Sequence, residues 1–166
     1  MPKRKQEPNR PSARILAPGA CRVDIPRRPL PKPKELCAKW FFDEVDCLFG
    51  LEWTDIVVPD YGETEFLAGN FTPAPVAGEE RVLVFAAANG CRVATALEVV
   101  IVAAACPAFL GRVPLVAPGS FVPFDGRRWV AAVTSDYRGQ LLQARDMDNV
   151  GVSGWRILFA RLRQQP

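Results

Sequence analysis

Apolar residues in the second half of the chain occur in short runs that are separated by turn-forming residues. Short runs rich in Val, Ile, Leu and aromatic side chains, bounded by Gly, Pro or Asp, are typical of β-strands. The pattern predicts strands over residues 82–85, 92–105, 112–115, 120–122, 128–133, 140–145 and 155–161. Such a succession of strands predicts an all-β domain that is built as a sandwich or a barrel.

Aromatic residues are concentrated between residues 35 and 58. Their spacing predicts a short amphipathic helix with one apolar face. The side chains expected on that face are Trp40, Phe41, Val45, Leu48 and Phe49. Weaker patterns predict strands over 55–58 and 64–67. Burial in the core is the favoured interpretation of the aromatic cluster, and an exposed patch that binds a partner is the alternative.

Residues 1–34 differ in composition from the rest of the chain. They hold half of the sixteen prolines, and their net charge is +8, whereas the chain as a whole carries +3. A basic, proline-rich segment with few large apolar groups cannot bury enough surface to offset its ordering entropy. We therefore predict a disordered basic arm over residues 1–34 and one folded β domain over residues 35–166.

The arm contains two clusters of basic residues, which are Lys3, Arg4 and Lys5, and then Arg27 and Arg28. Such clusters are typical of a nuclear-import signal or of an arm that binds anions such as nucleic acid. A solvated tail without a binding role is an equally good interpretation.

The five cysteines form no Cys-x-x-Cys pair, and the chain has no histidine. Neither a zinc site nor another cofactor site is therefore expected. Dispersed cysteines suit a reducing compartment, and no secretory signal is visible. The longest apolar run, Val99–Ala105, is too short to cross a bilayer. We expect an intracellular protein, in the nucleus or cytoplasm of a host cell, without a membrane partner.

One stretch, Val133–Leu141, carries more information than the rest. Its sequence places Ser, Asp and Gly between two β-prone runs, which predicts a hairpin turn. The turn carries Tyr137 and Arg138, although a plain tight turn requires neither an aromatic ring nor a guanidinium group. The hairpin is therefore a candidate functional site.

The same stretch resembles the third motif of the dUTPase family, a hairpin that receives deoxyuridine. Upstream, the apolar run Leu97–Val102 followed by Pro107–Val113 is similar to that family's strand, Pro, aromatic and Gly-Arg-Val passage. Downstream, Gly154–Ile157 resembles its fourth motif, a turn that enters a late strand. These matches occur in the family's order within about residues 90–163. The resemblance implies a jelly-roll-like β-barrel.

The departures from the family's motifs concern its chemistry. The position of the catalytic Asp is occupied by Thr134, whose hydroxyl cannot act as a general base near neutral pH. The Arg-Ser pair of the second motif is missing from residues 114–120. The first motif is matched only weakly, at residues 77–80. The fourth motif's Gln is Phe159, and the glycine-rich fifth motif is absent. The resemblance therefore implies the fold without the hydrolytic activity.

The resemblance also implies roles for the remaining residues. Tyr137 corresponds to the tyrosine that packs on deoxyribose, and Asp136, Arg138 and Gly139 would complete the remnant of the nucleoside pocket. Arg156 would be a remnant of phosphate binding. The structural alternatives are a Tyr137 that contacts a neighbouring subunit, a turn built by Arg138 and Gly139, and an Arg156 in a salt bridge.

A replacement magnesium site would require acidic residues that converge. The candidates are Asp136, Asp146 and Asp148. Carboxylate oxygens are the ligands that magnesium prefers. Asp-Met-Asp-Asn at 146–149 has the composition of an ordinary turn, so no metal site is expected.

Three functions remain open. The first is a catalytically inactive dUTPase-related protein of viral origin, as large DNA viruses carry, which binds a host or viral protein. The second is a divergent dUTP or nucleotide diphosphohydrolase. The third is a virion or nucleic-acid-associated structural protein that uses the basic arm. The family resemblance also implies a homotrimer, and fold resemblance alone does not decide among the functions.

Overall fold

The structure is a computed structural model that describes residues 11, 13–26, 31–40, 42–57, 61–70, 79–149 and 155–162. Strands make up 47% of the described residues and helices 28%. The β-rich class predicted from the sequence is therefore confirmed, although the helical share is larger than the apolar pattern indicated. Lys3, Arg4, Lys5, Arg27 and Arg28 lie outside the described residues.

The strands form one large mixed sheet with the order β1-β2-β5-β10-β7-β8-β9-β3, and β4 and β6 pair with β7 and β10. The strands are β1 (Ala13–Ala17), β2 (Ala20–Ile25), β3 (Glu44–Val45), β4 (Thr54–Asp55), β5 (Gly62–Asn70), β6 (Cys91–Val93), β7 (Leu115–Phe124), β8 (Arg127–Asp136), β9 (Gly139–Asp146) and β10 (Arg156–Arg161). The β3–β9 and β7–β10 pairs are parallel, and the others are antiparallel. The sheet is not closed, because β1 and β3 form its two edges, so the jelly-roll-like barrel that the resemblance implies is not shown.

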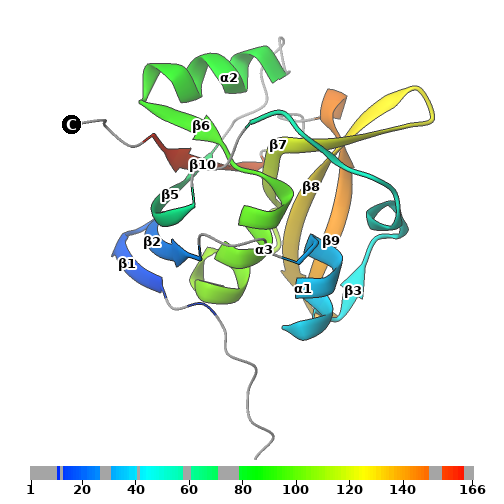
Figure 1. Cartoon of the computed structure of the whole chain (residues 1–166), viewed down its shortest axis with the longest axis horizontal. Coiled ribbons are helices and arrows are strands. Elements are labelled where there is room, and N and C mark those ends of the chain that lie inside the picture. The colour runs from blue at the N-terminus through cyan, green and yellow to red at the C-terminus, as the bar shows by residue number, and fades with distance from the viewer. Residues whose placement is uncertain are drawn as a thin grey trace, which may run out of the picture.

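Three helices accompany the sheet (Figure 1). They are α1 (Pro33–Lys39), α2 (Glu79–Ala88) and α3 (Ala96–Ala105). Short 3₁₀ turns occur at Cys47–Gly50, Pro107–Phe109 and Met147–Asn149. Within the described part of the chain, no helix is long and apolar enough to cross a membrane.

Apolar residues cover both faces of the central strands. Along β8, Ala131 and Val133 belong to the larger core with α1 and α3, whereas Val130 and Ala132 belong to a second core with α2. This alternation follows from the two-residue period of a strand. Because both faces are covered, these strands have nearly continuous apolar sequences. In Figure 1, α3 lies at the centre, between β2 and β5 on one side and β7, β8 and β9 on the other.

The long strand predicted over residues 92–105 is wrong. Only Cys91–Val93 is a strand, and Ala96–Ala105 is helix α3, including the Leu97–Val102 run that was compared with a family strand. Thr95 and Glu98 form a reciprocal capping box at the start of α3. That cap and the terminal alanines favour a helix, and burial of α3 among sheet residues overrides the strand propensity of its Val and Ile residues.

Three shorter predictions also need correction. Residues 82–85 lie in helix α2, which begins with two glutamates and ends with three alanines, and residues 112–114 precede β7 instead of forming a strand. The amphipathic helix expected around Trp40–Phe49 is absent, because α1 ends before Trp40 and a strand and a 3₁₀ turn follow it. Of the strand expected at 55–58, only Asp55 belongs to a strand among the described residues.

The prediction of a disordered arm over residues 1–34 is wrong for its central part. Strands β1 and β2 lie within it, and β2 pairs with β5 through all six of its residues. Cys21, Val23 and Ile25 are buried and alternate with polar residues, so this segment does have an apolar face. The folded domain therefore begins before residue 35 and includes at least residues 13–26.

The cysteines act mainly as small apolar residues, as expected from their dispersion. Four are buried, Cys47 is exposed, and all five are free thiols. Burial raises the pKa of Cys37 to about 12 and also raises the pKa of Cys21. These buried thiols therefore remain protonated, and protonated thiols are poor nucleophiles.

Candidate functional site

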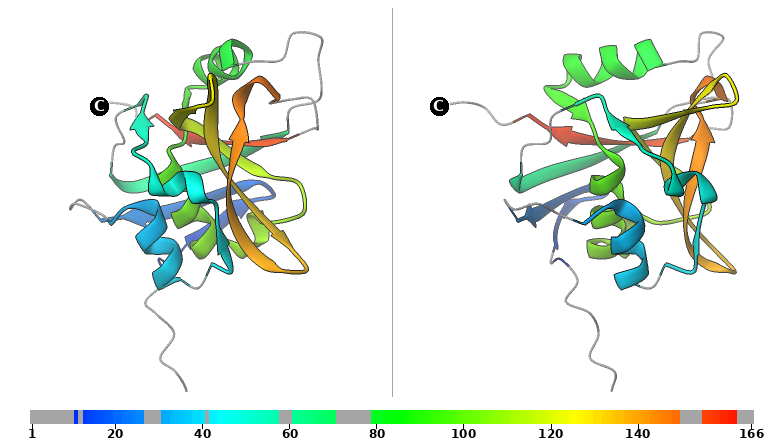
Figure 2. Two further views of the ribbon diagram at one scale, coloured as in Figure 1. Left: turned by 90° about the vertical axis from the view of Figure 1, so that its right-hand side faces the viewer. Right: turned by 45° about the vertical axis from the view of Figure 1, so that its right-hand side comes forward.

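The predicted hairpin is present and consists of β8, a two-residue turn and β9. Asp136 pairs with Gly139 at the end of the ladder, so Tyr137 and Arg138 form the tip. Tyr137 is 96% exposed, the highest exposure of any large apolar or aromatic residue in the described chain. In both views of Figure 2 this end of the yellow-to-orange strand pair lies opposite helix α2. The tip therefore projects into solvent.

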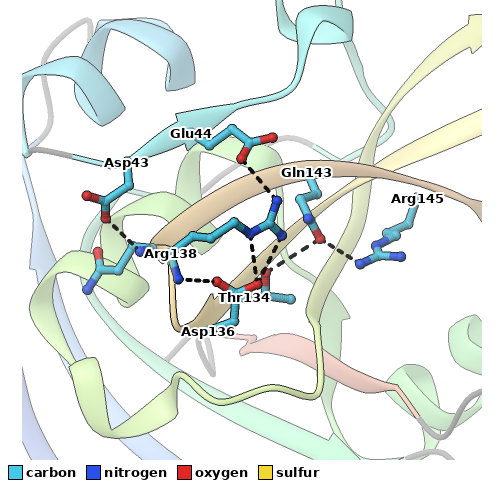
Figure 3. Close-up of polar contacts among 8 residues, drawn as sticks. Asp43, Glu44, Thr134, Asp136, Arg138, Gln143 and Arg145 are labelled. Carbon is cyan, nitrogen blue, oxygen red and sulfur yellow. Dashed lines mark hydrogen bonds and ion pairs between the residues drawn. The ribbon is translucent and has the colours of Figure 1, made fainter.

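An ion-pair network fixes the turn (Figure 3). The backbone N–H of Arg138 donates to Asp136 at 2.8 Å, and its guanidinium group donates to the same carboxylate at 3.0 Å. A second guanidinium nitrogen lies 3.3 Å from the carboxylate of Glu44 on β3. The side-chain and then the backbone hydrogen bonds from Arg138 lower the pKa of Asp136. Asp136 is therefore a weakly basic carboxylate engaged by an arginine.

Asp43 holds the other arm of the turn. Its carboxylate accepts a hydrogen bond from the N–H of Gln140 at 2.8 Å, and its own N–H donates to the Gln140 carbonyl at 2.9 Å. Gly139 lies beside this carboxylate with φ +112°, and a Cβ there would collide with Asp43. Glycine is required at this position because it tolerates the backbone angle and leaves room for Asp43.

Thr134 lies on β8 and is almost buried, with 5% exposure. Its hydroxyl donates to the side-chain oxygen of Gln143 at 3.5 Å, and the same oxygen accepts a 2.6 Å bond from Arg145 (Figure 3). Position 134, where the resemblance to dUTPases implies a carboxylate in that family, thus carries a hydroxyl group that faces an amide. This arrangement provides no general base for activating water.

Arg156 begins β10 and lies under the turn that precedes β7. Its guanidinium group donates to the carbonyl of Val113 at 3.1 Å, and burial lowers its pKa. Its Nε atom is buried without a partner. The neighbouring Gly111 carbonyl accepts a hydrogen bond from the N–H of Ser135, at the base of the hairpin. Arg156 therefore contacts the backbone of the turn rather than a carboxylate.

The acids considered for magnesium do not converge. Asp146 pairs with Trp129 at one end of the β8–β9 ladder, and Asp136 lies seven residues from Trp129 at the other end. This spacing corresponds to about 23 Å along a strand. Asp146 instead binds Arg127 at 2.9 Å and caps the N–H of Asp148. Across the described residues, no three His, Cys, Asp or Glu side chains form a group that could hold a metal ion.

Sequence reasoning did not identify Asp43 and Glu44 as parts of this site. They lie more than ninety positions before their partners Gln140 and Arg138. A parallel pairing of β3 with β9 brings them to the hairpin. No local signal in the sequence indicates such a long-range pairing, so only the structure identifies them.

Comparison with models of known protein families finds no match, and comparisons with curated proteins and with solved structures find none either. The function is therefore argued from the geometry of the chain.

Proposed function

We propose that this chain is a dUTPase-related protein of viral origin that has lost hydrolysis and acts by binding a partner protein through its β8–β9 hairpin. The exposure of Tyr137 carries this proposal, because the 96% exposed ring stands on a turn that is fixed from both sides. Tyrosine and arginine are enriched among the residues that dominate protein–protein binding energies. A fixed turn also limits the entropy that is lost on binding.

The chemistry around the hairpin supports a binding role over catalysis. Thr134 supplies no carboxylate, and Asp136 is engaged by Arg138, which lowers its pKa and its strength as a base. Among the described residues, no three His, Cys, Asp or Glu side chains form a group that could hold a metal ion to activate water in place of that carboxylate.

The arrangement of the three motif-like stretches supports the relation to dUTPases. The turn before β7, the base of the hairpin and the start of β10 lie together, joined through the Gly111 and Val113 carbonyls. These stretches resemble, in order, the family's Gly-Arg-Val passage before its second motif, its third motif and its fourth motif. We therefore treat the open sheet as a divergent derivative of the dUTPase-like jelly roll. Helix α3, in place of a strand, is the largest departure.

The partner on this proposal is a host or viral protein with a pocket for an aromatic ring. The rim around Tyr137 combines the Arg138 guanidinium with the carboxylates of Asp136 and Glu44. Such a rim favours a partner surface that carries both an acidic and a basic group beside an apolar pocket.

A photo-crosslinking amino acid in place of Tyr137 tests the proposal in cells that make the full chain. Phe124, which is 50% exposed beside the β7–β8 turn, is the matched control position. We expect one discrete adduct from position 137 and none from position 124. We also expect the isolated adduct partner to bind Tyr137→Phe nearly normally and Tyr137→Ala weakly. Equal labelling from both positions would contradict the proposal.

A further inference from the structure

A hollow of about 270 Å³ lies where the start of α1, the loop before β4 and the start of α3 meet. It contains no residue of the hairpin. Helices α1 and α3 contact each other and lie side by side in Figure 1, and residues at the start of each line the hollow. Small-molecule sites commonly measure about 300–1,000 Å³. At about 270 Å³ this hollow lies just below that range, so a ligand of mononucleotide size would be held there only in part, with the rest in solvent.

The hollow has an aromatic floor. Phe49 and Trp53 are stacked with their ring centres 4.3 Å apart and their planes 9° from parallel. Phe49 is buried and Trp53 is partly exposed, and both line the hollow. The indole N–H donates to the Leu48 carbonyl at 3.0 Å, which fixes the ring plane. Because Phe49 covers one face of Trp53, its other face is suited to stack on a further planar ring.

The walls of the hollow carry opposite charges. Lys32 and Lys34 are exposed on the α1 side, and the carboxylates of Glu52 and Asp55 are exposed on the β4 side. The Asp55 carboxylate is held by the hydroxyl group of Ser120, which also accepts the first N–H of α3 at 2.8 Å. The first N–H of that helix is thus satisfied within the protein, so an anion in the hollow would depend on the lysines.

Tyr61 also lines this hollow, and its environment is electronegative. Burial raises the pKa of its hydroxyl group, and the nearby carboxylates of Glu98 and Asp55 raise it further. Glu98 is itself neutralised by Arg92 at 2.6 Å. Of these two carboxylates, Asp55 lines the hollow, so it provides an acceptor for hydrogen-bond donors on this wall.

We propose that the hollow binds a nucleoside monophosphate whose base carries an exocyclic amino group, such as adenine or cytosine. The base stacks on Trp53, its amino group donates to Asp55, and Lys32 and Lys34 pair with the phosphate. Free phosphate would use the lysines alone. Uracil carries no exocyclic amino group for the carboxylate. The indole ring, the carboxylate acceptor and the two lysines together therefore favour a nucleotide with an amino-bearing base over free phosphate or a uracil nucleotide.

This site is separate from the hairpin, so its test and that of the proposed function are independent. The full chain, labelled with ¹⁵N, is titrated with AMP, UMP, adenosine and inorganic phosphate while the indole N–H signal of Trp53 is followed. That signal is assigned among the four tryptophans with Trp53→Phe. We expect saturable AMP binding that is about tenfold tighter than binding of each other probe, the scale of one base-edge contact.

Three variants test the assigned roles. Lys32→Ala combined with Lys34→Ala should weaken AMP about tenfold and leave adenosine unchanged. Because both lysines are exposed, this variant retains the fold. Asp55→Asn should remove the preference for AMP over UMP, and Tyr137→Ala should change nothing. The absence of saturable binding, equal affinities for AMP and UMP, or a full response to phosphate alone would overturn the proposal.

Discussion

Replacing Gly139 with alanine tests whether the hairpin tip is as tightly fitted as its contacts indicate. Gly139 has φ +112°, and an added Cβ would collide with the Asp43 carboxylate. Gly126, in the β7–β8 turn, is the matched control, because its φ is +67° and a Cβ there meets nothing within 4 Å. Both substitutions place a Cβ at positive φ. However, +67° lies in the left-handed region that other residues reach, whereas +112° lies outside it, so Gly139→Ala adds both further backbone strain and a collision.

The magnitudes follow from these two effects. A left-handed backbone costs a residue with a Cβ about 1–2 kcal/mol, which sets the expectation for Gly126→Ala. In Gly139→Ala, Asp43 must also move away from the Gln140 N–H. Losing one hydrogen bond at an exposed site costs about 1 kcal/mol. Gly139→Ala should therefore lower the free energy of unfolding by at least about 2–3 kcal/mol.

Urea denaturation followed by circular dichroism measures both variants, with the slope and midpoint fitted separately. Asp43→Ala should relieve the collision, so Gly139→Ala combined with Asp43→Ala should be less destabilised than the sum of the single changes. Two results would refute the reasoning that Asp43 holds the hairpin. One is a loss of stability in Gly139→Ala no larger than that in Gly126→Ala. The other is a double variant whose loss equals the sum of the losses from Gly139→Ala and Asp43→Ala.

Further predictions concern packing, pH and assembly. Gly119→Ala should destabilise the fold by several kcal/mol in the same urea assay, because its Cβ would lie 2.5 Å from the Ala94 carbonyl oxygen; an unchanged midpoint would contradict the close approach. Arg138 lowers the pKa of Asp136 in the folded state. The stability that the Asp136–Arg138 pair contributes should therefore be fully present above the unfolded pKa of Asp, which is near 4, and should be lost as the pH falls through the folded pKa. Carboxyl NMR titration checks this, and Arg138→Ala should restore an ordinary pKa. From the family resemblance alone we expect a homotrimer, and light scattering that gives the mass of one chain would exclude it.

The strands and the hairpin were accessible from the sequence because their signals are local. Apolar runs bounded by turn residues located β8, β9 and β10 to within a few residues. The Asp-Tyr-Arg-Gly sequence predicted that Tyr137 and Arg138 form the tip of a hairpin, and the structure places them there with Tyr137 exposed. In these segments the strand period, the turn chemistry and the final packing favour the same structure.

Helix α3 was missed because burial, rather than propensity, determines it. The centre of α3 is rich in Val and Ile, yet it is covered on every side and begins with a capping box. The Thr95-x-x-Glu98 spacing was the sequence signal that could have identified it. Likewise, the alternation of Cys21, Val23 and Ile25 was the signal for β2 within a segment whose composition indicated disorder.

The supporting residues of the site could not be predicted. Asp43 and Glu44 reach the hairpin through the parallel β3–β9 pair, and no short-range pattern encodes that contact. The unpaired Nε of Arg156 and the hollow beside Trp53 likewise depend on tertiary packing. Local sequence patterns thus located the exposed tip, whereas the residues that hold it required the assembled sheet.

The most direct test of the central claim is a dUTP hydrolysis assay on the purified full chain. Lacking a positioned general base typically costs about two to four decades in rate. The second and fifth dUTPase motifs, which the resemblance associates with phosphate binding, also have no counterpart in the sequence. We therefore expect no turnover above background from the wild type, and none from Thr134→Asp. Clear turnover by the wild type that is abolished by Tyr137→Ala would contradict the account and identify the chain as a divergent hydrolase.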